Sequence, residues 1–269
     1  MIITDLDHTM LGRGLKADGI PETLDLLKIA GIRVVPNTAK TLEEVHLVWT
    51  RVLQRRPPEL VAFENSSAIA SPTNTLPYAD YRVEIEGQVY HVLELSIRLE
   101  EYSREAYNIA RDACPHVRRI EELSDEILVE LTGIPVDHAR AAKKRRYDLV
   151  LWAADKNCLS RAGETLESTG YTTVLGANFL HVITHPGKRQ AVEWVRANRH
   201  LLGAWTRIVA LGDAPVDKGM LEVSDIPIVV PRDGVRVRPR ASYLIAPCQA
   251  PHGWVKIVRE LLINGSIFK

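Results

Sequence analysis

The sequence lacks the features of a membrane protein or of a chain that binds nucleic acid through its charge. Its longest uninterrupted apolar stretch, residues 149–154, is far short of the ~20 residues that a spanning helix needs. No basic leader or long apolar segment precedes Asp5, so we expect no secretory signal. Lys plus Arg and Asp plus Glu both total 34, and the missing basic excess disfavours nucleic acid as the main partner.

Cysteine is scarce as well. Cys114, Cys158 and Cys248 are odd in number, widely spaced and outside any CxxC pattern. This pattern disfavours a disulfide framework or a zinc site and predicts buried thiols in a reducing cytoplasm. The remaining expectation is a cytoplasmic enzyme or small-molecule binder. No feature of the sequence indicates an oligomeric state.

The chain is long enough to form a large hydrophobic core. Its 269 residues correspond to one large domain with an insert, or to two domains. Short apolar runs at 1–4, 32–35 and 60–63 predict buried strands, with helical patterns between them, and a similar alternation returns over 186–263. Strands that alternate with helices predict βαβ units around a parallel sheet.

Residues 81–184 have a different pattern. A hairpin is predicted over 81–95 with its turn at Gly87, followed by several helical stretches and by two further β-rich pieces at 171–175 and 179–184. Hairpins mixed with helices favour an α+β unit. The predicted fold is therefore α/β: a Rossmann-like core with a parallel sheet from 1–80 and 185–269, interrupted by an inserted α+β domain at 81–184.

Polar clusters directly follow three of the predicted core strands, at residues 5–9, 37–40 and 212–217. Because the carboxyl ends of parallel strands share one edge of a sheet, these clusters are expected to meet in one pocket. Lys188 is predicted at the start of a helix, where a cation costs about 0.3–1 kcal/mol against the helix dipole. A bound anion would offset that cost.

The acids of these clusters point to a particular chemistry. At 4 Å, two carboxylates repel by roughly 4 kcal/mol at an effective dielectric of 20, so a group of them needs a counter-ion, and an all-oxygen set favours Mg²⁺. A carboxylate can attack phosphorus to form an acyl phosphate, while a second acid protonates the leaving oxygen and then activates water. The candidate carboxylates are Asp5, Asp7, Asp213 and Asp217. Thr38 and Lys188 would contact the phosphoryl oxygens.

Each of these signals has a plain structural alternative when taken alone. A DxD pair is often a turn or a helix cap, Thr38 a loop hydroxyl, Lys188 a surface lysine and Gly212-Asp213 a turn. The occurrence of all four in order, each at the end of a predicted strand or helix, favours a site.

At these residues the sequence resembles the haloacid dehalogenase (HAD) superfamily of phosphotransferases. The matching motifs, in order, are Asp5-x-Asp7-x-Thr9, Thr38, Lys188 and Gly212-Asp213…Asp217. The large insert between the second and third motifs resembles the subgroup of capped sugar phosphatases. The resemblance implies that Asp5 is the nucleophile and Asp7 the general acid/base. It also implies that Mg²⁺ is held by Asp5, the Asp7 backbone carbonyl and Asp213, with Asp217 orienting a metal-bound water.

Within this subgroup the chain is most similar to the mannosyl-3-phosphoglycerate phosphatases. The matching segments include 38–41, 64–65, 131–133, 139–148, 187–188 and 246–254. The resemblance implies hydrolysis of mannosyl-3-phosphoglycerate to mannosylglycerate, a compatible solute, and phosphate. The sequence departs from the family where His8 and Ser66-Ser67 replace glycines, where Ala214 and Val216 replace serine and asparagine, and where Asn178 replaces an arginine.

Candidates for binding the rest of the substrate lie mainly in the insert. The densest basic run covers 140–146 and is interpreted either as a solvated helix end or as a source of cations for a glyceryl carboxylate, with Arg140 and Lys144 as candidates. Lys40 is a candidate nearer the phosphate. Asn178 and His181 are candidates because 176–181 resembles a GGRFxH segment of the family.

Other functions stay open at this point. They are the same hydrolysis on another sugar phosphate, such as glucosyl-3-phosphoglycerate or sucrose phosphate, a phosphosugar mutase, and a non-catalytic sensor of sugar phosphates. All of them take a small phosphorylated molecule as partner.

Overall fold

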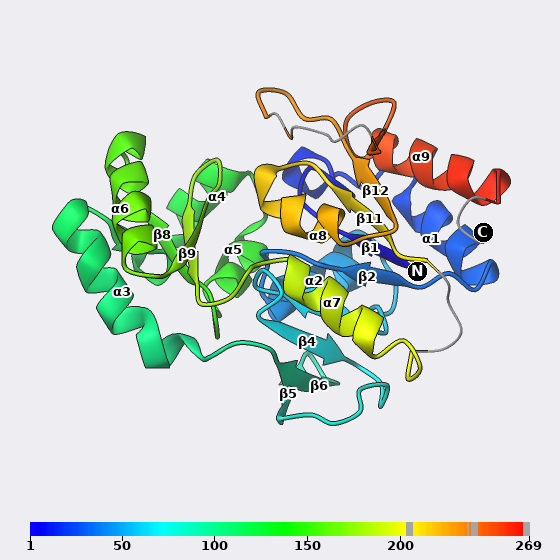
Figure 1. Ribbon diagram of the computed structural model, residues 1–269, viewed down its shortest axis with the longest axis horizontal. Coiled ribbons are helices and arrows are strands. Elements are labelled where there is room, and N and C mark those ends of the chain that lie inside the picture. The colour runs from blue at the N-terminus through cyan, green and yellow to red at the C-terminus, as the bar shows by residue number, and fades with distance from the viewer. Residues whose placement is uncertain (203–206, 236, 238–241, 266–269) are drawn as a thin grey trace.

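The computed structural model describes residues 1–202, 207–235, 237 and 242–265. A five-stranded parallel sheet lies at the centre of the larger lobe, and a smaller lobe, green at the left of Figure 1, carries an antiparallel sheet. The strands of the parallel sheet, in spatial order, are β13 (Leu244–Ile245), β12 (Ile226–Val229), β11 (Val209–Gly212), β1 (Ile2–Thr4) and β2 (Val34–Pro36). The predicted α/β fold with a parallel core sheet is confirmed.

The central strands are apolar because both faces of this sheet are covered. Successive side chains of β1 point to opposite faces, so Ile2 packs into one hydrophobic core and Ile3 into the other. Helices α1 (Ile20–Ile29) and α9 (His252–Ile263) cover the first face, while α7 (Arg189–Ala197) and α8 (Lys218–Glu222) cover the second (Figure 1). Layers of this kind leave the carboxyl ends of the strands open at one edge.

A second sheet continues beyond β2. Its spatial order is β3 (Val61–Phe63), β4 (Ala68–Ser71), β6 (Gln88–Glu94) and β5 (Tyr81–Ile85), all antiparallel. The backbone N–H of Thr38 donates to the carbonyl of Ala62 at 3.1 Å and so joins the end of β2 to β3. Between β2 and β3 lie α2 (Leu42–Leu47), which begins with a capping box at Thr41, and the short helix η2 (Val48–Val52). The predicted hairpin over 81–95 is confirmed as β5 and β6.

The smaller lobe is built on the third sheet. Its strands, in spatial order, are β7 (Arg118–Arg119), β8 (Leu149–Trp152), β10 (Leu180–Ile183) and β9 (Thr172–Leu175). Its helices are α3 (Leu99–Ala113), α4 (Asp125–Thr132), α5 (Val136–Ala142) and α6 (Lys156–Ser168). Leu149 and Leu151 face α3 and α6, whereas Val150 faces the cluster that α4 and α5 help to form. Figure 1 shows α5 on the side of the lobe that is turned toward the core.

The strand pairing places the first boundary of the inserted domain later in the chain than the predicted residue 81. The hairpin β5–β6 pairs with β4 and not with the sheet of the smaller lobe. The two connections between the lobes meet farther along, where the hydroxyls of Ser96 and Thr184 lie 2.9 Å apart. We therefore propose that the inserted domain begins after Leu95 rather than at residue 81, and that it ends near residue 184 as predicted.

The expectation of three free thiols is wrong. Cys114 at the end of α3 and Cys158 in α6 form a disulfide, and only Cys248 is a free cysteine. The two residues are 44 positions apart, yet α3 and α6 pack side by side on the same face of a sheet, which sequence spacing does not reveal. The cysteine pattern therefore gives no support for a reducing compartment. Among the described residues, no helix has the length and apolar character to cross a membrane.

Candidate active site

The four predicted motifs meet at the carboxyl edge of the parallel sheet. Asp5 directly follows β1, Thr38 lies two residues beyond β2, Asp213 directly follows β11, and Lys188 immediately precedes α7. All four are buried. Loops that leave neighbouring parallel strands at the same edge bring together residues that are more than 200 positions apart, as the topology predicts.

Three carboxylates form the centre of the site. Oxygen atoms of Asp5, Asp213 and Asp217 all lie within 4.8 Å of one another. This spacing is close to the ~4.2 Å spanned by two Mg–oxygen bonds, so the cluster is able to hold a metal cation. The carboxylate of Asp7 is not a member of this cluster, and the ligand that the resemblance implies for this residue is its backbone carbonyl.

Lys188 is the cation that faces these acids. Its Nζ donates to Asp5 Oδ1 and to Asp217 Oδ1, both at 2.6 Å. Burial alone would lower the pKa of Lys188, but Asp217 and Asp5 outweigh burial and raise it. The lysine is therefore held in its charged form beside the predicted nucleophile.

Burial also changes the titration of the acids. It is the main cause that raises the pKa of Asp5 well above its usual value, against the opposing effect of Lys188. It raises the pKa of Asp213 to about 6, with the neighbouring Asp217 as the second cause. Carboxyl groups that are costly to ionise without added positive charge favour a bound cation at this position.

The fourth-motif loop is ordered by Asp217. Its Oδ2 accepts hydrogen bonds from the backbone N–H groups of Asp213 and Ala214, both at 3.0 Å. A Cβ added at Gly212 would lie 2.3 Å from the Cβ of Asp217, so this close approach requires glycine. The loop is thus held by backbone donors, without the polar side chains that Ala214 and Val216 replace.

Two of the three residues that replace family glycines have left-handed backbone conformations. His8 has φ 60° and Ser66 has φ 73°, a region that favours glycine. Hydrogen bonds from the serine side chains accompany the second replacement: Ser66 Oγ donates to Asn37 Oδ1 at 2.7 Å, and Ser67 Oγ lies 2.8 Å from His185 Nε2. The side chain of Asn37 in turn donates to the Lys188 carbonyl at 2.8 Å.

Asp7 lies beside Lys40. The Lys40 Nζ is 2.9 Å from Asp7 Oδ2 and 3.4 Å from Glu44 Oε1. Desolvation alone would raise the pKa of Asp7, but the charge and hydrogen bond of Lys40, together with His8 and Lys188, lower that pKa. The predicted general acid/base therefore has a cation of its own, distinct from Lys188.

A cavity of about 570 Å³ lies over these residues, between the core and the inserted domain. Asp5, Asp7, Thr38, Lys188 and Asp213 line its core side. Among the predicted substrate-binding residues, Lys40, Asn178 and His181 line it as well. Asn178 Nδ2 donates to the Leu131 carbonyl at 2.7 Å and ties β9–β10 to α4.

The other two predicted substrate-binding residues lie elsewhere. Arg140 is exposed on α5 and pairs with Asp125 of α4 at 2.7 Å, and Lys144 is exposed in the turn after α5. Neither residue lines the cavity, because α5 ends at Ala142 and the chain then folds Arg145 inward. Arg145 lines the cavity, where its Nη1 donates to the Ala39 carbonyl at 2.8 Å.

The sequence reasoning missed Arg232, whereas Thr9 belongs to the predicted first motif. Arg232 lines the cavity and its Nη1 lies 3.1 Å from Asp213 Oδ2; Thr9 Oγ1 donates to the other oxygen of the same carboxylate at 2.8 Å. Arg232 follows β12 by three residues, so the rule that strand ends share an edge would have found it.

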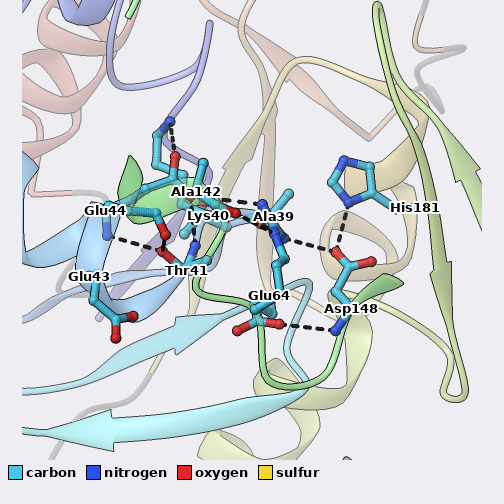
Figure 2. A network of polar contacts seen from close by, with 12 residues as sticks. Ala39, Lys40, Thr41, Glu43, Glu44, Glu64, Ala142, Asp148 and His181 are labelled. Atoms are coloured by element: carbon cyan, nitrogen blue, oxygen red, sulfur yellow. Dashed lines mark hydrogen bonds and ion pairs between the residues drawn. The ribbon is translucent and has the colours of Figure 1, made fainter. Parts of the chain in front are cut away.

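The two lobes are joined by a buried polar network (Figure 2). The carboxylate of Glu64 accepts hydrogen bonds from the backbone N–H groups of Arg146, Tyr147 and Asp148 at 2.9–3.1 Å. Arg146 also pairs with Glu43 of α2 through two hydrogen bonds, at 2.6 and 2.9 Å. These contacts hold the start of β8 against the core.

The chain is similar over most of its length to phosphatases. It is 29% identical over 236 residues to a glucosyl-3-phosphoglycerate/mannosyl-3-phosphoglycerate phosphatase of Persephonella marina, covering 86% of this chain and 84% of the relative. It is 27% identical over 268 residues to a mannosyl-3-phosphoglycerate phosphatase of Aeropyrum pernix, covering 97% and 94%. No protein-family profile matches the chain.

The fold is also that of known hydrolases. A haloacid dehalogenase-like hydrolase from B. subtilis has a TM-score of 0.68 at 16% identity, covering 97% of this chain and 99% of that structure. The predicted resemblance to mannosyl-3-phosphoglycerate phosphatases is confirmed by these relatives, and the fold is that of haloacid dehalogenase-like hydrolases.

Proposed function

We propose that this protein, with its haloacid dehalogenase fold, is a Mg²⁺-dependent phosphatase that hydrolyses mannosyl-3-phosphoglycerate to mannosylglycerate and phosphate. The observation that carries the proposal is the convergence of Asp5, Asp213, Asp217 and Lys188 at one sheet edge beneath a cavity. The names of the two relatives support the substrate.

The donor set fits Mg²⁺. Three buried carboxylates within 4.8 Å of one another supply only oxygen ligands, which this hard cation prefers. Asp5 and Asp213 would hold it, and the cation would supply positive charge to the phosphoryl oxygens. Asp217 reaches the site through Oδ1 while its Oδ2 holds the loop.

The residues of the chain would divide the reaction into two displacements. Asp5 attacks phosphorus, the P–O bond to the glycerate oxygen breaks, and Asp7 protonates that oxygen as it leaves. Asp7 then removes a proton from water, which attacks phosphorus and releases Asp5. Lys40, 2.9 Å from Asp7, favours the ionised carboxylate that this second step needs and disfavours the protonated form that the first step uses. Lys188 holds Asp5 in place and faces the phosphoryl oxygens.

The cavity suits a substrate with two anionic ends. Its volume of about 570 Å³ has room for a sugar and a glycerate beyond the phosphate. Arg145 and Lys40 bring positive charge to its wall, as a carboxylate would require. The glucosyl ester is a second candidate because the Persephonella marina relative carries both sugars in its name.

The test is release of inorganic phosphate from a panel of phosphorylated sugars and glycerates, with and without Mg²⁺. We expect mannosyl-3-phosphoglycerate or its glucosyl analogue to have the highest kcat/KM, and EDTA to abolish turnover. A mutase would need a bisphosphate activator and release little phosphate. A sensor would bind the esters and turn none of them over, and Asp5→Asn would leave its function in the cell unchanged.

A further inference from the structure

One polar group in the cavity has a support of its own in the inserted domain. His181 lies on β10, and its Nδ1 is 2.7 Å from Oδ2 of Asp148, which immediately precedes β8 (Figure 2). The His181 side chain lines the cavity, whereas Asp148 is completely buried behind it. The pair therefore connects the cavity wall to the interior.

The proton on this ring is fixed by its partner. Asp148 Oδ2 also accepts hydrogen bonds from Asn65 Nδ2 at 2.9 Å and from Arg145 Nη1 at 3.2 Å. An oxygen surrounded by donors acts as acceptor, so Nδ1 of His181 must carry the hydrogen. The other ring nitrogen, Nε2, lies on the side of the ring away from Asp148 (Figure 2). It has no partner among the described residues.

The same carboxylate reaches across to the core. Arg145 donates one Nη1 to both Asp148 and the Ala39 carbonyl, and Asn65 belongs to the loop after β3. Ala39 lies between Thr38 and Lys40, two residues of the proposed active site. Asp148 thus contacts both His181 and residues of the core, so the orientation of His181 depends on the contact between the lobes.

We propose that Asp148 is a positioning residue that holds His181 with Nε2 toward the cavity, where it accepts a hydrogen bond from a hydroxyl of the non-phosphate part of the substrate. This inference rests on the proposed function, because it assumes that the ester fills the cavity. Such an arrangement gives specificity for the leaving alcohol, since a side chain held by a second residue loses little freedom on binding.

Two substitutions of the histidine separate its two nitrogens. An asparagine side chain places its amide near the position of Nδ1 and keeps the hydrogen bond to Asp148, but it does not reach the cavity. A glutamine side chain reaches the position of Nε2. We expect KM for mannosyl-3-phosphoglycerate to rise at least tenfold in His181→Asn and less in His181→Gln, with smaller changes in kcat. The exposed His116, in the same domain, provides the control His116→Asn.

A second ester tests whether the effect belongs to the leaving alcohol. The alcohol of p-nitrophenyl phosphate has neither carboxylate nor sugar hydroxyls. In His181→Asn, we therefore expect the ratio of kcat/KM for the sugar ester to kcat/KM for p-nitrophenyl phosphate to fall at least tenfold. Asp148→Asn should shift the same ratio in the same direction. An equal loss with both esters in the His181 variants, or no rise of KM in His181→Asn, would overturn the proposal even if Asp148→Asn does not fold.

Binding of the product, mannosylglycerate, by calorimetry separates this proposal from the proposed function. If the wild-type protein binds mannosylglycerate, and His181→Asn weakens that binding about tenfold, but no ester is hydrolysed, the inference stands and the phosphatase proposal fails. If the wild-type protein hydrolyses the sugar ester, and His181→Asn binds and turns over as well as His116→Asn, the inference fails alone. If the wild-type protein neither binds the product nor hydrolyses the ester, both fail.

Discussion

Glu64 gives the contact between the lobes a predictable pH dependence. Burial is the largest cause that raises its pKa, from 4.5 to about 7, against the opposing effects of Arg145 and of the backbone donors. Because the folded-state pKa is above the unfolded value, the folded protein binds the extra proton between these two values. Stability is therefore lost as pH rises from about 4.5 through 7. The difference between the two pKa values converts to about 3 kcal/mol.

The variant Glu64→Gln isolates this contribution. A glutamine oxygen can still accept the hydrogen bonds of Tyr147 and Asp148, but it does not ionise. We expect the free energy of unfolding of Glu64→Gln minus that of the wild-type protein to increase by up to about 3 kcal/mol as the pH rises from 4.5 to 8. Urea denaturation at several pH values measures this difference.

Taking the difference between the two proteins removes the effect of other titrating groups. Burial lowers the pKa of His185 to about 4, so that group contributes stability that is lost as pH falls, opposite to Glu64. A relative stability that does not change with pH, or that favours the wild-type protein increasingly at high pH, would refute the reasoning. The second result would mean that the backbone donors to Glu64 outweigh its burial.

Three further predictions concern the metal cluster, its lysine and the disulfide. Mg²⁺ should raise the melting temperature of the wild-type protein and of the exposed control Asp233→Asn, by the equivalent of about 2.7 kcal/mol at 100 times its Kd; a similar rise in Asp213→Asn would contradict the site. Lys188→Met should lose phosphate release at least a thousandfold and about 3–5 kcal/mol of stability, because it leaves buried acids without their cation; wild-type turnover would exclude the assigned role. Cys158→Ser should lower the free energy of unfolding by about 2–4 kcal/mol in non-reducing buffer, and an unchanged value there would argue against the bond.

The fold and the position of the catalytic residues at one sheet edge could be predicted from the sequence for one physical reason. Parallel strands are buried on both faces and therefore appear as short apolar runs, and their carboxyl ends share one edge. This rule predicts from the sequence alone that Asp5, Thr38 and Asp213 lie together. Applied to β12, it would also have identified Arg232.

The inserted domain was harder to predict, because its site residues depend on where a helix ends and on which face a side chain takes. Arg140 and Lys144 belong to the basic run 140–146, but Arg145 is the basic residue of this run that lines the cavity after the end of α5. The disulfide between Cys114 and Cys158 depends on the packing of α3 against α6. Asp148 lies in the matching segment 139–148, but its role depends on Asn65 and His181 in distant segments as well as on Arg145, three residues earlier.

The most direct test of the central claim follows the phosphoryl group itself. Wild-type protein is mixed with phosphate-labelled mannosyl-3-phosphoglycerate, quenched in acid within the first turnover, and digested for mass spectrometry. The account predicts a transient label on the peptide that contains Asp5, absent from Asp5→Asn. Full turnover with no labelled peptide at any quench time, or a label on another residue, would contradict it.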